Sequence, residues 1–303
     1  MCLKASLSFF GRLGRYTLES CVSPVVSHVW TAKSYDGRRV IIKFRKEVEN
    51  DCLLEREREN LLRFRSPYIR ALVDVPAEEY NGPPFLVLKH MDVSLPDMWK
   101  RRQEPPFKEM ITSLLRALNV IHTRNYVHTD IEPRNILLSK VGMPNMEVKL
   151  ADFENVFEAP NNFPIQPLAV RSPEVWLSLP WGPSADIWNL GLLFVRIRFQ
   201  ALLLDLKCPD IDEFRRKIMY LTKMKRLFGL NNPWPDAFLQ SDCANDLKLV
   251  DSLVAQTKTP SMASFLAARN GTEVEIDFAT QMLQIDPAKR WTAELLSHRW
   301  VTG

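Results

Sequence analysis

The most informative part of the sequence is Tyr126-Val-His-Thr-Asp-Ile-Glu-Pro-Arg-Asn-Ile-Leu-Leu138. It places a His-x-Asp group five residues before an Asn, and the apolar run Ile136–Leu138 that follows is a predicted strand. A carboxylate and an amide beside a strand end are groups that can handle a proton and a metal ion. The alternative is a turn between a helix and a strand whose polar residues are incidental.

Segments farther along the chain add polar groups in a defined order. Asp152 ends an apolar predicted strand, and Glu174 and Asp186 follow it. The segments are Val148-Lys-Leu-Ala-Asp-Phe-Glu154, Arg171-Ser-Pro-Glu174, Ala185-Asp-Ile-Trp-Asn-Leu-Gly191 and the stretch from Met282 to Leu296, which contains Arg290. The order and spacing of the whole set argue against coincidence.

In this order the segments resemble the motifs of the eukaryotic protein kinase family. The resemblance covers nearly the whole chain, from Tyr16 to Trp300. It implies an α+β, two-lobed protein-kinase-like fold, with a small antiparallel β lobe containing one helix at residues 1–91 and a larger α-helical lobe at 92–303. Within the family, the motifs look most like those of the kinases that phosphorylate serine/arginine-rich proteins and of their fungal relatives.

Residue patterns support two halves of different kinds. Between Tyr16 and Leu88, runs rich in Val, Ile and aromatics are broken by turn signals such as Asp36-Gly37 and Asn81-Gly82, which predicts mainly antiparallel strands. One helix is expected within this region, over Val48 to Arg65, where Leu54, Leu61 and Leu62 recur at helical spacing.

From Met91 onward the period becomes helical. One helix should end near His122 and present a single apolar face, made of Ile111, Leu114, Leu115, Leu118 and Ile121. A second, Ser184 to Phe199, is apolar around nearly its whole circumference and should be buried, with Ser184 as its N-cap. The stretch Asn155 to Pro167 is expected to be a long loop, and Ala201 to Val274 an insert without a readable motif.

The resemblance implies roles for the catalytic residues. Asp130 would accept or orient the hydroxyl proton of the substrate, with His128 packed beneath the loop. Asn135 and Asp152 would hold Mg²⁺. Asp186 would anchor the catalytic loop through hydrogen bonds to its backbone, and Arg290 would pair with the buried Glu174.

The first lobe would bind ATP. Lys43, in Val40-Ile-Ile-Lys43, would neutralise the α- and β-phosphates and be held by Glu57, with Glu55 and Glu59 as rival partners. The hinge that bonds adenine would be formed by the backbone at Lys89, His90 and Met91. The remaining nucleotide-binding positions are Val22, Val29, Ile41 and Leu137, of which Val29 and Leu137 would enclose the base; ordinary core packing is the alternative for the apolar ones.

Several residues depart from the family pattern. The phosphate-covering loop is expected to be glycine-rich, but Val22, Pro24 and Ser27 stand at the matching positions. Glu132 replaces a Lys that contacts the transferred phosphoryl group, and Arg134 is a candidate substitute for that cation. A Thr, a Gly and an Ala of the family are replaced here by Pro167, Glu154 and Ile41.

A further departure concerns regulation. Thr129 replaces the Arg that in many kinases binds an activation-loop phosphate, and the segment from Glu154 to Arg171 contains no Ser, Thr or Tyr. The sequence therefore predicts a domain that is not switched on by phosphorylation of this segment.

Composition limits the classes of partner. A net charge of +4 on 303 residues is too small and too evenly spread for a polyanion-binding surface, so we expect no nucleic-acid partner. No run is long and apolar enough for a membrane span or a signal peptide, so none is expected. The odd number of scattered cysteines indicates a reducing intracellular location, cytoplasm or nucleus; they are Cys2, Cys21, Cys52, Cys208 and Cys243.

Three functions remain in competition. The first is a protein Ser/Thr kinase, expected as a monomer, that uses ATP and Mg²⁺ to phosphorylate a protein substrate; Pro133 favours Ser and Thr over Tyr. The second is a pseudokinase scaffold, indicated by Glu132, Pro167 and the missing glycines. The third is a small-molecule kinase, which should lack the set of Glu174, Asp186 and Arg290.

Overall fold

The computed structural model describes residues 7–23, 26–44, 51–206, 211–229, 233–256 and 260–303. By their internal contacts, the residues divide into two compact units, Met1–Pro105 with Arg134–Val156 and Pro106–Pro133 with Phe157–Gly303. The predicted boundary after Met91 stays a prediction. In terms of packing, the β-rich unit also takes in residues 92–105 and 134–156.

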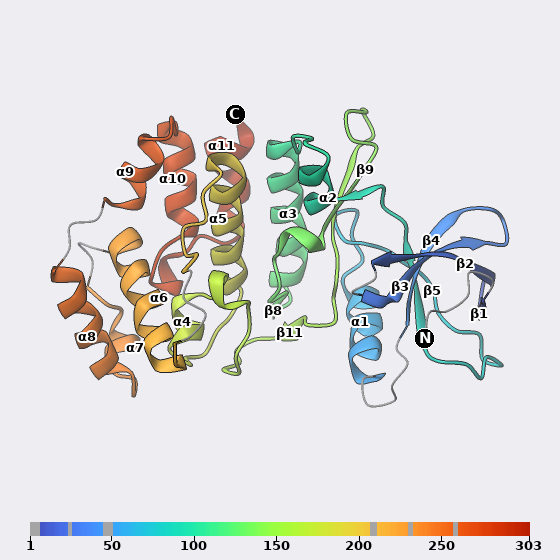
Figure 1. The fold of residues 1–303 in the computed structure, drawn as a ribbon, viewed down its shortest axis with the longest axis horizontal. Coiled ribbons are helices and arrows are strands. Elements are labelled where there is room, and N and C mark those ends of the chain that lie inside the picture. Colours follow the sequence, from blue (N-terminus) through green and yellow to red (C-terminus); the bar gives the residue numbers. More distant parts are fainter. Residues whose placement is uncertain (1–6, 24–25, 45–50, 207–210, 230–232, 257–259) are drawn as a thin grey trace. The chain divides into compact units, whose positions relative to one another are not determined.

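The first unit contains an antiparallel sheet of six strands in the order β1-β2-β3-β4-β6-β5 (Figure 1). The strands are β1 (Ser8–Gly11), β2 (Gly14–Ser23), β3 (Val26–Ser34), β4 (Arg39–Phe44), β5 (Leu72–Asp74) and β6 (Phe85–Lys89). The apolar side chains Phe9, Trp30, Ile42 and Phe85 belong to the buried core that packs on this sheet. The prediction of antiparallel strands between Tyr16 and Leu88 is confirmed.

Strand register places Lys43 near the middle of the sheet. On β4 it lies opposite Val29 of β3 and opposite Leu86 of β6. Three residues earlier on β4, Val40 lies opposite Lys89, the last residue of β6. Lys43 and the start of the predicted hinge are thus fixed by one ladder of backbone hydrogen bonds.

Helix α1 (Asp51–Arg63) packs beside β5 and β6. Leu54 and Leu61 are buried as predicted, but Leu62 is 41% exposed because the next residue along a helix turns away from the buried face. Residues 48–50 of the predicted helix lie outside the described residues.

Shorter elements complete the first unit. Ser94 caps helix α2 (Leu95–Lys100), its side chain accepting a hydrogen bond from the Asp97 backbone N–H. A second sheet has the order β10-β9-β7, with β7 (Val93–Ser94), β9 (Ile136–Ser139) and β10 (Glu147–Leu150). Strand β9 therefore begins directly after Asn135, and β10 ends two residues before Asp152.

The second unit is helical. Helices α3 (Phe107–His122) and α10 (Glu273–Met282) pack against α5 (Ser184–Phe199), which is buried over most of its circumference, as predicted (Figure 1). The apolar face predicted for α3 is buried throughout. The prediction that Ser184 is the N-cap is wrong: Ser184 is already helical, because the proline ring of Pro183 holds φ at −47° and starts the turn one residue earlier.

Helices also occupy most of the predicted insert at 201–274. The remaining helices of the unit are α4 (Pro173–Trp176), α6 (Glu213–Phe228), α7 (Asp236–Leu239), α8 (Ala244–Ala255), α9 (Met262–Ala267) and α11 (Arg299–Thr302). A two-stranded ladder joins β8 (Tyr126–Val127) to β11 (Phe157–Glu158), so the predicted loop from Asn155 begins with a short strand. Among the described residues, no helix is both long and apolar enough to cross a membrane.

Candidate active site

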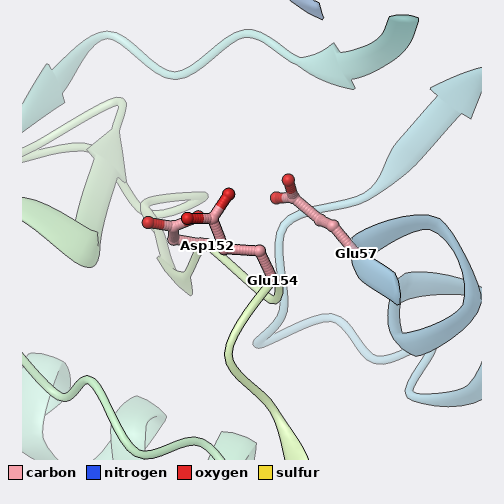
Figure 2. A group of neighbouring side chains, drawn as sticks. All are labelled: Glu57, Asp152 and Glu154. Atoms are coloured by element: carbon pink, nitrogen blue, oxygen red, sulfur yellow. The ribbon is translucent and has the colours of Figure 1, made fainter. Parts of the chain in front are cut away.

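Lys43 lies among three carboxylates of the first unit. Its Nζ is 2.7 Å from Glu57 Oε2, 2.7 Å from Asp152 Oδ1 and 3.1 Å from Glu154 Oε2. Figure 2 shows Glu57 approaching from α1 and the other two from the segment that follows β10. The Lys43 ammonium group donates a hydrogen bond to Asp152 Oδ1, and its contacts with the two glutamates are ion pairs.

Burial and charge act in opposite directions on this cluster. Burial lowers the pKa of the Lys43 ammonium, but the three carboxylates outweigh burial and raise the pKa above its usual value. Burial raises the pKa of Glu57, and the positive charge of Lys43 opposes that rise. Lys43 therefore stays protonated at neutral pH and holds together groups that would otherwise repel one another.

Helix geometry explains why Glu57 is the partner of Lys43. Leu54, Glu57 and Leu61 are spaced by three and four residues and share the buried face of α1. The rival candidates Glu55 and Glu59 are exposed, and Glu55 instead pairs with Arg58 at 2.5 Å. The predicted pairing of Lys43 with Glu57 is present.

The segment carrying Asp152 is anchored by its backbone and by Phe153. Asp152 adopts a positive φ of 67°, and Phe153 is fully buried against Phe64. The Asn60 side chain donates to the carbonyls of Phe153 and Val156, at 3.0 and 3.1 Å. The sequence analysis missed Asn60, although its place three residues after Glu57 puts it on the same buried face.

Asn135 lies close to this segment through the backbone. The Ala151 N–H donates to the Asn135 carbonyl at 2.9 Å, next to Asp152. Asn135 is buried, and the side chain of Asp152 is 29% exposed. The structure therefore brings both predicted metal-binding residues into one part of the first unit.

Oxygen ligands suited to a divalent cation are present there. Carboxylate oxygens of Glu57, Asp152 and Glu154 lie within 4.8 Å of one another. Mg²⁺ prefers oxygen ligands and usually takes only one or two protein carboxylates together with phosphates. Asp152, with Asn135 beside it, fits that requirement, whereas Glu57 is committed to Lys43.

The predicted nucleotide-binding side chains lie on separate strands of the first unit. Val29 is half-buried on β3 and Ile41 is buried on β4. Leu137 is half-buried on β9. Val22 is 54% exposed near the end of β2, and Pro24 lies outside the described residues. The register of β3 and β4 places Val29 opposite Lys43, so these two are brought together.

The predicted hinge begins at Lys89, whose backbone N–H and carbonyl both form hydrogen bonds. Its N–H donates to the Ala71 carbonyl at 2.9 Å, and its carbonyl accepts from Arg70 Nε at 2.9 Å. Its side chain lies 2.5 Å from Glu147 Oε2. His90 and Met91 follow, and burial lowers the pKa of His90.

Arg70 was missed by the sequence analysis. Burial lowers the pKa of its guanidinium to about 10, and the negative charges of Glu57 and Asp152 oppose this. Its electrostatic environment thus connects the Lys43 cluster with the start of the hinge. The available signal was a charged residue in the otherwise apolar run Ile69-Arg-Ala-Leu-Val73.

In the second unit, Asp186 holds the backbone that precedes Asp130. Its Oδ2 accepts from the His128 N–H at 2.7 Å, and its Oδ1 accepts from the Thr129 N–H at 2.8 Å. His122 Nε2 lies 2.9 Å from Oδ2. Thr129 has a positive φ of 68°, so these bonds fix a backbone conformation that Thr rarely adopts. The anchoring expected of Asp186 is present, and Asp130 is 8% exposed beside it.

The buried pair expected at the end of the chain is also present. Arg290 donates to both oxygens of Glu174, at 2.6 and 2.7 Å, and both side chains are almost fully buried. Arg290 also donates to the carbonyls of Gln284, Ile285 and Ser184. These hydrogen bonds offset the free-energy cost of burying the charged guanidinium of Arg290.

Gln166 is a third residue that the sequence analysis missed. Its Nε2 donates to the Ala185 carbonyl at 2.9 Å and to the Asn189 side chain, and its Oε1 accepts from the Ser172 N–H at 2.8 Å. It therefore ties the segment around Pro167 to α5, although Pro167 itself has no side-chain donor. A Gln beside the unexpected Pro was the signal in the sequence.

Comparison with known proteins agrees with this geometry. The protein kinase domain model matches residues 25–301. Cyclin-dependent kinase G1 of Arabidopsis thaliana is 26% identical over 231 residues, covering 71% of this chain and 35% of the relative. The mouse dual specificity protein kinase CLK1 is 24% identical over 301 residues, covering 86% and 60%.

Another relative matches over most of its length. Cell division control protein 2 homolog 1 of Trypanosoma brucei brucei is 28% identical over 272 residues, covering 85% of this chain and 86% of the relative. The chain thus spans between about a third and most of the length of these relatives.

A solved structure has the same fold. In the crystal structure of the yeast RNA Pol II CTD kinase CTDK-1 complex, one chain aligns with a TM-score of 0.75 at 18% identity, covering 95% of this chain and 93% of that one. The β-rich and helical units therefore form a protein kinase fold. With the family model matched from residue 25 to residue 301, the chain belongs to the protein kinase domain family.

Proposed function

We propose that this domain binds ATP with Mg²⁺ and transfers the γ-phosphate to Ser or Thr hydroxyls of an intracellular protein. The observation that carries the proposal is the contact of Lys43 with both Glu57 and Asp152. It places a cation for the phosphates beside a carboxylate for the metal, the pair of groups that phosphoryl transfer requires.

Each residue has a stated role in this reaction. Lys43, oriented by Glu57, binds the α- and β-phosphates, and Asp152 with Asn135 holds Mg²⁺, which neutralises developing charge when bound. Asp130 orients the substrate hydroxyl and takes its proton. Asp186 supports the last role, because its bonds to the His128 and Thr129 backbone fix the entry to Asp130.

The base would lie against the backbone of the hinge at Lys89, His90 and Met91. Val29, Ile41 and Leu137 would supply its apolar surroundings, and Val22, which is exposed, would lie on the phosphate side. Basic, serine/arginine-rich segments are the proposed substrates, on the strength of the His-Thr-Asp-Ile and Arg-Ser-Pro-Glu motifs. The protein acts as a monomer in the cytoplasm or nucleus under this proposal.

A pseudokinase scaffold is the second candidate, and one contact favours it. Glu154 lies 3.1 Å from Lys43 Nζ and competes with phosphate for that ammonium group. Glu132 adds a negative charge near Asp130 in sequence, where the family pattern has a cation.

One experiment separates the two candidates. Purified protein is mixed with Mg²⁺ and ATP, and the nucleotide-dependent shift in melting temperature is measured together with phosphate transfer to basic and Ser/Arg-rich peptides. We expect a shift and transfer, with transfer abolished in Asp130→Ala while the shift persists. Binding without transfer by the wild-type protein favours the scaffold, and transfer that survives in Asp130→Ala contradicts the catalytic assignment.

A further inference from the structure

Arg70 occupies the acceptor at the start of the hinge. Its Nε donates to the Lys89 carbonyl at 2.9 Å, and the Lys89 N–H is already bonded to the Ala71 carbonyl. The Lys89 N–H is therefore not available to a purine base, and one of the two lone pairs of the Lys89 carbonyl is already used. Base recognition is left to His90 and Met91, the next two residues.

The two Nη groups of the Arg70 guanidinium indicate which purine bases the site prefers. Within the part of the chain that the structure describes, the Nη1 and Nη2 groups of Arg70 have no hydrogen-bond or ion-pair partner, and neither is sealed from solvent. Arginine carries only donors. The Nη donors of Arg70 therefore lie near the Lys89 carbonyl. A base with an exocyclic amino group would need an acceptor at this place.

Arg70 is also held in place. Its backbone N–H donates to the Leu150 carbonyl at 2.8 Å, and its neighbour Ile69 forms a parallel bridge with Leu150. The negative charges of Glu57 and Asp152 favour its charged form. Moving the guanidinium away would leave a positive charge without these interactions, so a nucleotide meets Arg70 as a fixed feature.

Purines differ in the group at position 6. Adenine presents a 6-amino donor, whereas hypoxanthine and guanine present a 6-oxo acceptor. When an Arg70 N–H group faces the 6-amino group of adenine, two donors meet and neither forms a hydrogen bond. When it faces the 6-oxo group of hypoxanthine or guanine, it donates a hydrogen bond to that oxygen. We propose that Arg70 removes the selectivity of the nucleotide site for adenine, an inference that rests on the proposed nucleotide site. As a result, 6-oxopurine nucleoside triphosphates bind at least as tightly as ATP.

The test compares ATP with inosine triphosphate, which differs from it in the purine 6-substituent and the accompanying protonation of N1. Dissociation constants are measured by calorimetry with Mg²⁺ for the wild-type protein, for Arg70→Leu and for Arg12→Leu, a control at an exposed arginine of the same unit. We expect inosine triphosphate to bind the wild-type protein at least as tightly as ATP. Arg70→Leu frees the Lys89 carbonyl and should shift the ratio of the two constants toward ATP by about tenfold, whereas Arg12→Leu should leave it unchanged.

The outcomes are distinguishable. Tighter binding of ATP than of inosine triphosphate by the wild-type protein overturns the inference and leaves the proposed kinase function intact. This comparison does not depend on the folding of any variant. A ratio unchanged in a folded Arg70→Leu protein also overturns it. Binding of neither nucleotide by the wild-type protein overturns the proposed function, and the inference with it.

Discussion

Glu154 Oε2 lies 3.1 Å from Lys43 Nζ, so a residue at a position where the family has glycine reaches the proposed phosphate-binding cation. Together with Glu57 and Asp152, it places three carboxylates around the ammonium group of Lys43. Figure 2 shows these three carboxylates. Phosphate oxygens must compete with Glu154 for Lys43, and the site as a whole carries excess negative charge.

Glu154→Gln should therefore strengthen nucleotide binding. The substitution removes the competing charge and keeps the size of the side chain, and we expect the dissociation constant for Mg²⁺-ATP to fall by about tenfold. Calorimetric titration checks this, with the exposed Glu79→Gln as the control. Unchanged or weaker binding would show that Glu154 does not compete with phosphate.

Lys43→Met should abolish nucleotide binding and also destabilise the fold. Without the ammonium group, buried carboxylates face one another, and the free energy of unfolding should fall by about 3–5 kcal/mol at neutral pH. Burial raises the pKa of Glu57, so this carboxylate takes up a proton in the folded state as the pH falls from neutral toward about 4, and the deficit should shrink over that range.

Urea unfolding of Lys43→Met at neutral pH and at about pH 4 provides the measurement. Lys33→Met, at an exposed lysine of β3, is the matched control. A deficit that stays constant between neutral and acid pH would contradict the electrostatic explanation.

Asp186→Asn should lower phosphate transfer and leave nucleotide affinity unchanged. An amide nitrogen would face one of the two backbone N–H groups that Asp186 now accepts, so the loop before Asp130 should lose one anchor. We expect kcat to fall by at least about tenfold, since proton transfer depends on the position of the base.

The assay for Asp186→Asn pairs transfer kinetics with a nucleotide-binding measurement. Asp205→Asn, at an exposed aspartate, should behave like the wild-type protein. An equal loss of affinity and of kcat would mean that Asp186 acts on the fold as a whole rather than on the position of Asp130.

Glu275→Gln should weaken the helical unit in a pH-dependent way. Burial raises the pKa of Glu275, but bonds from Arg198 at 2.5 Å and from Thr272 outweigh burial and hold the pKa below its usual value. A depressed folded-state pKa gives stability that is present above the unfolded pKa and lost as pH falls through the folded pKa.

The variant should thus be less stable than the wild-type protein by about 1–2 kcal/mol at neutral pH, and the difference should narrow below about pH 4. Chemical unfolding across this range tests the prediction, with the exposed Glu273→Gln on the same helix as the control. A difference that grows on acidification would reverse the sign and contradict it.

Features that depend on local spacing could be predicted from the amino-acid sequence alone. The period of α1 puts Glu57 on its buried face, and the apolar face of α3 and the all-round burial of α5 follow from composition along one helix. The motif order likewise predicted that Asp186 would anchor the His128 segment and that Arg290 would pair with Glu174.

The contacts of the unexpected polar residues, in contrast, depend on how distant segments pack together. Glu154 is visible in the sequence as a lost glycine, yet its contact with Lys43 joins residues that are more than a hundred positions apart. Arg70 reaches the Lys89 carbonyl, and Gln166 ties the segment around Pro167 to α5. Such contacts depend on which strands and helices pack together, and the direction of a long side chain is set by that packing rather than by its neighbours in the chain.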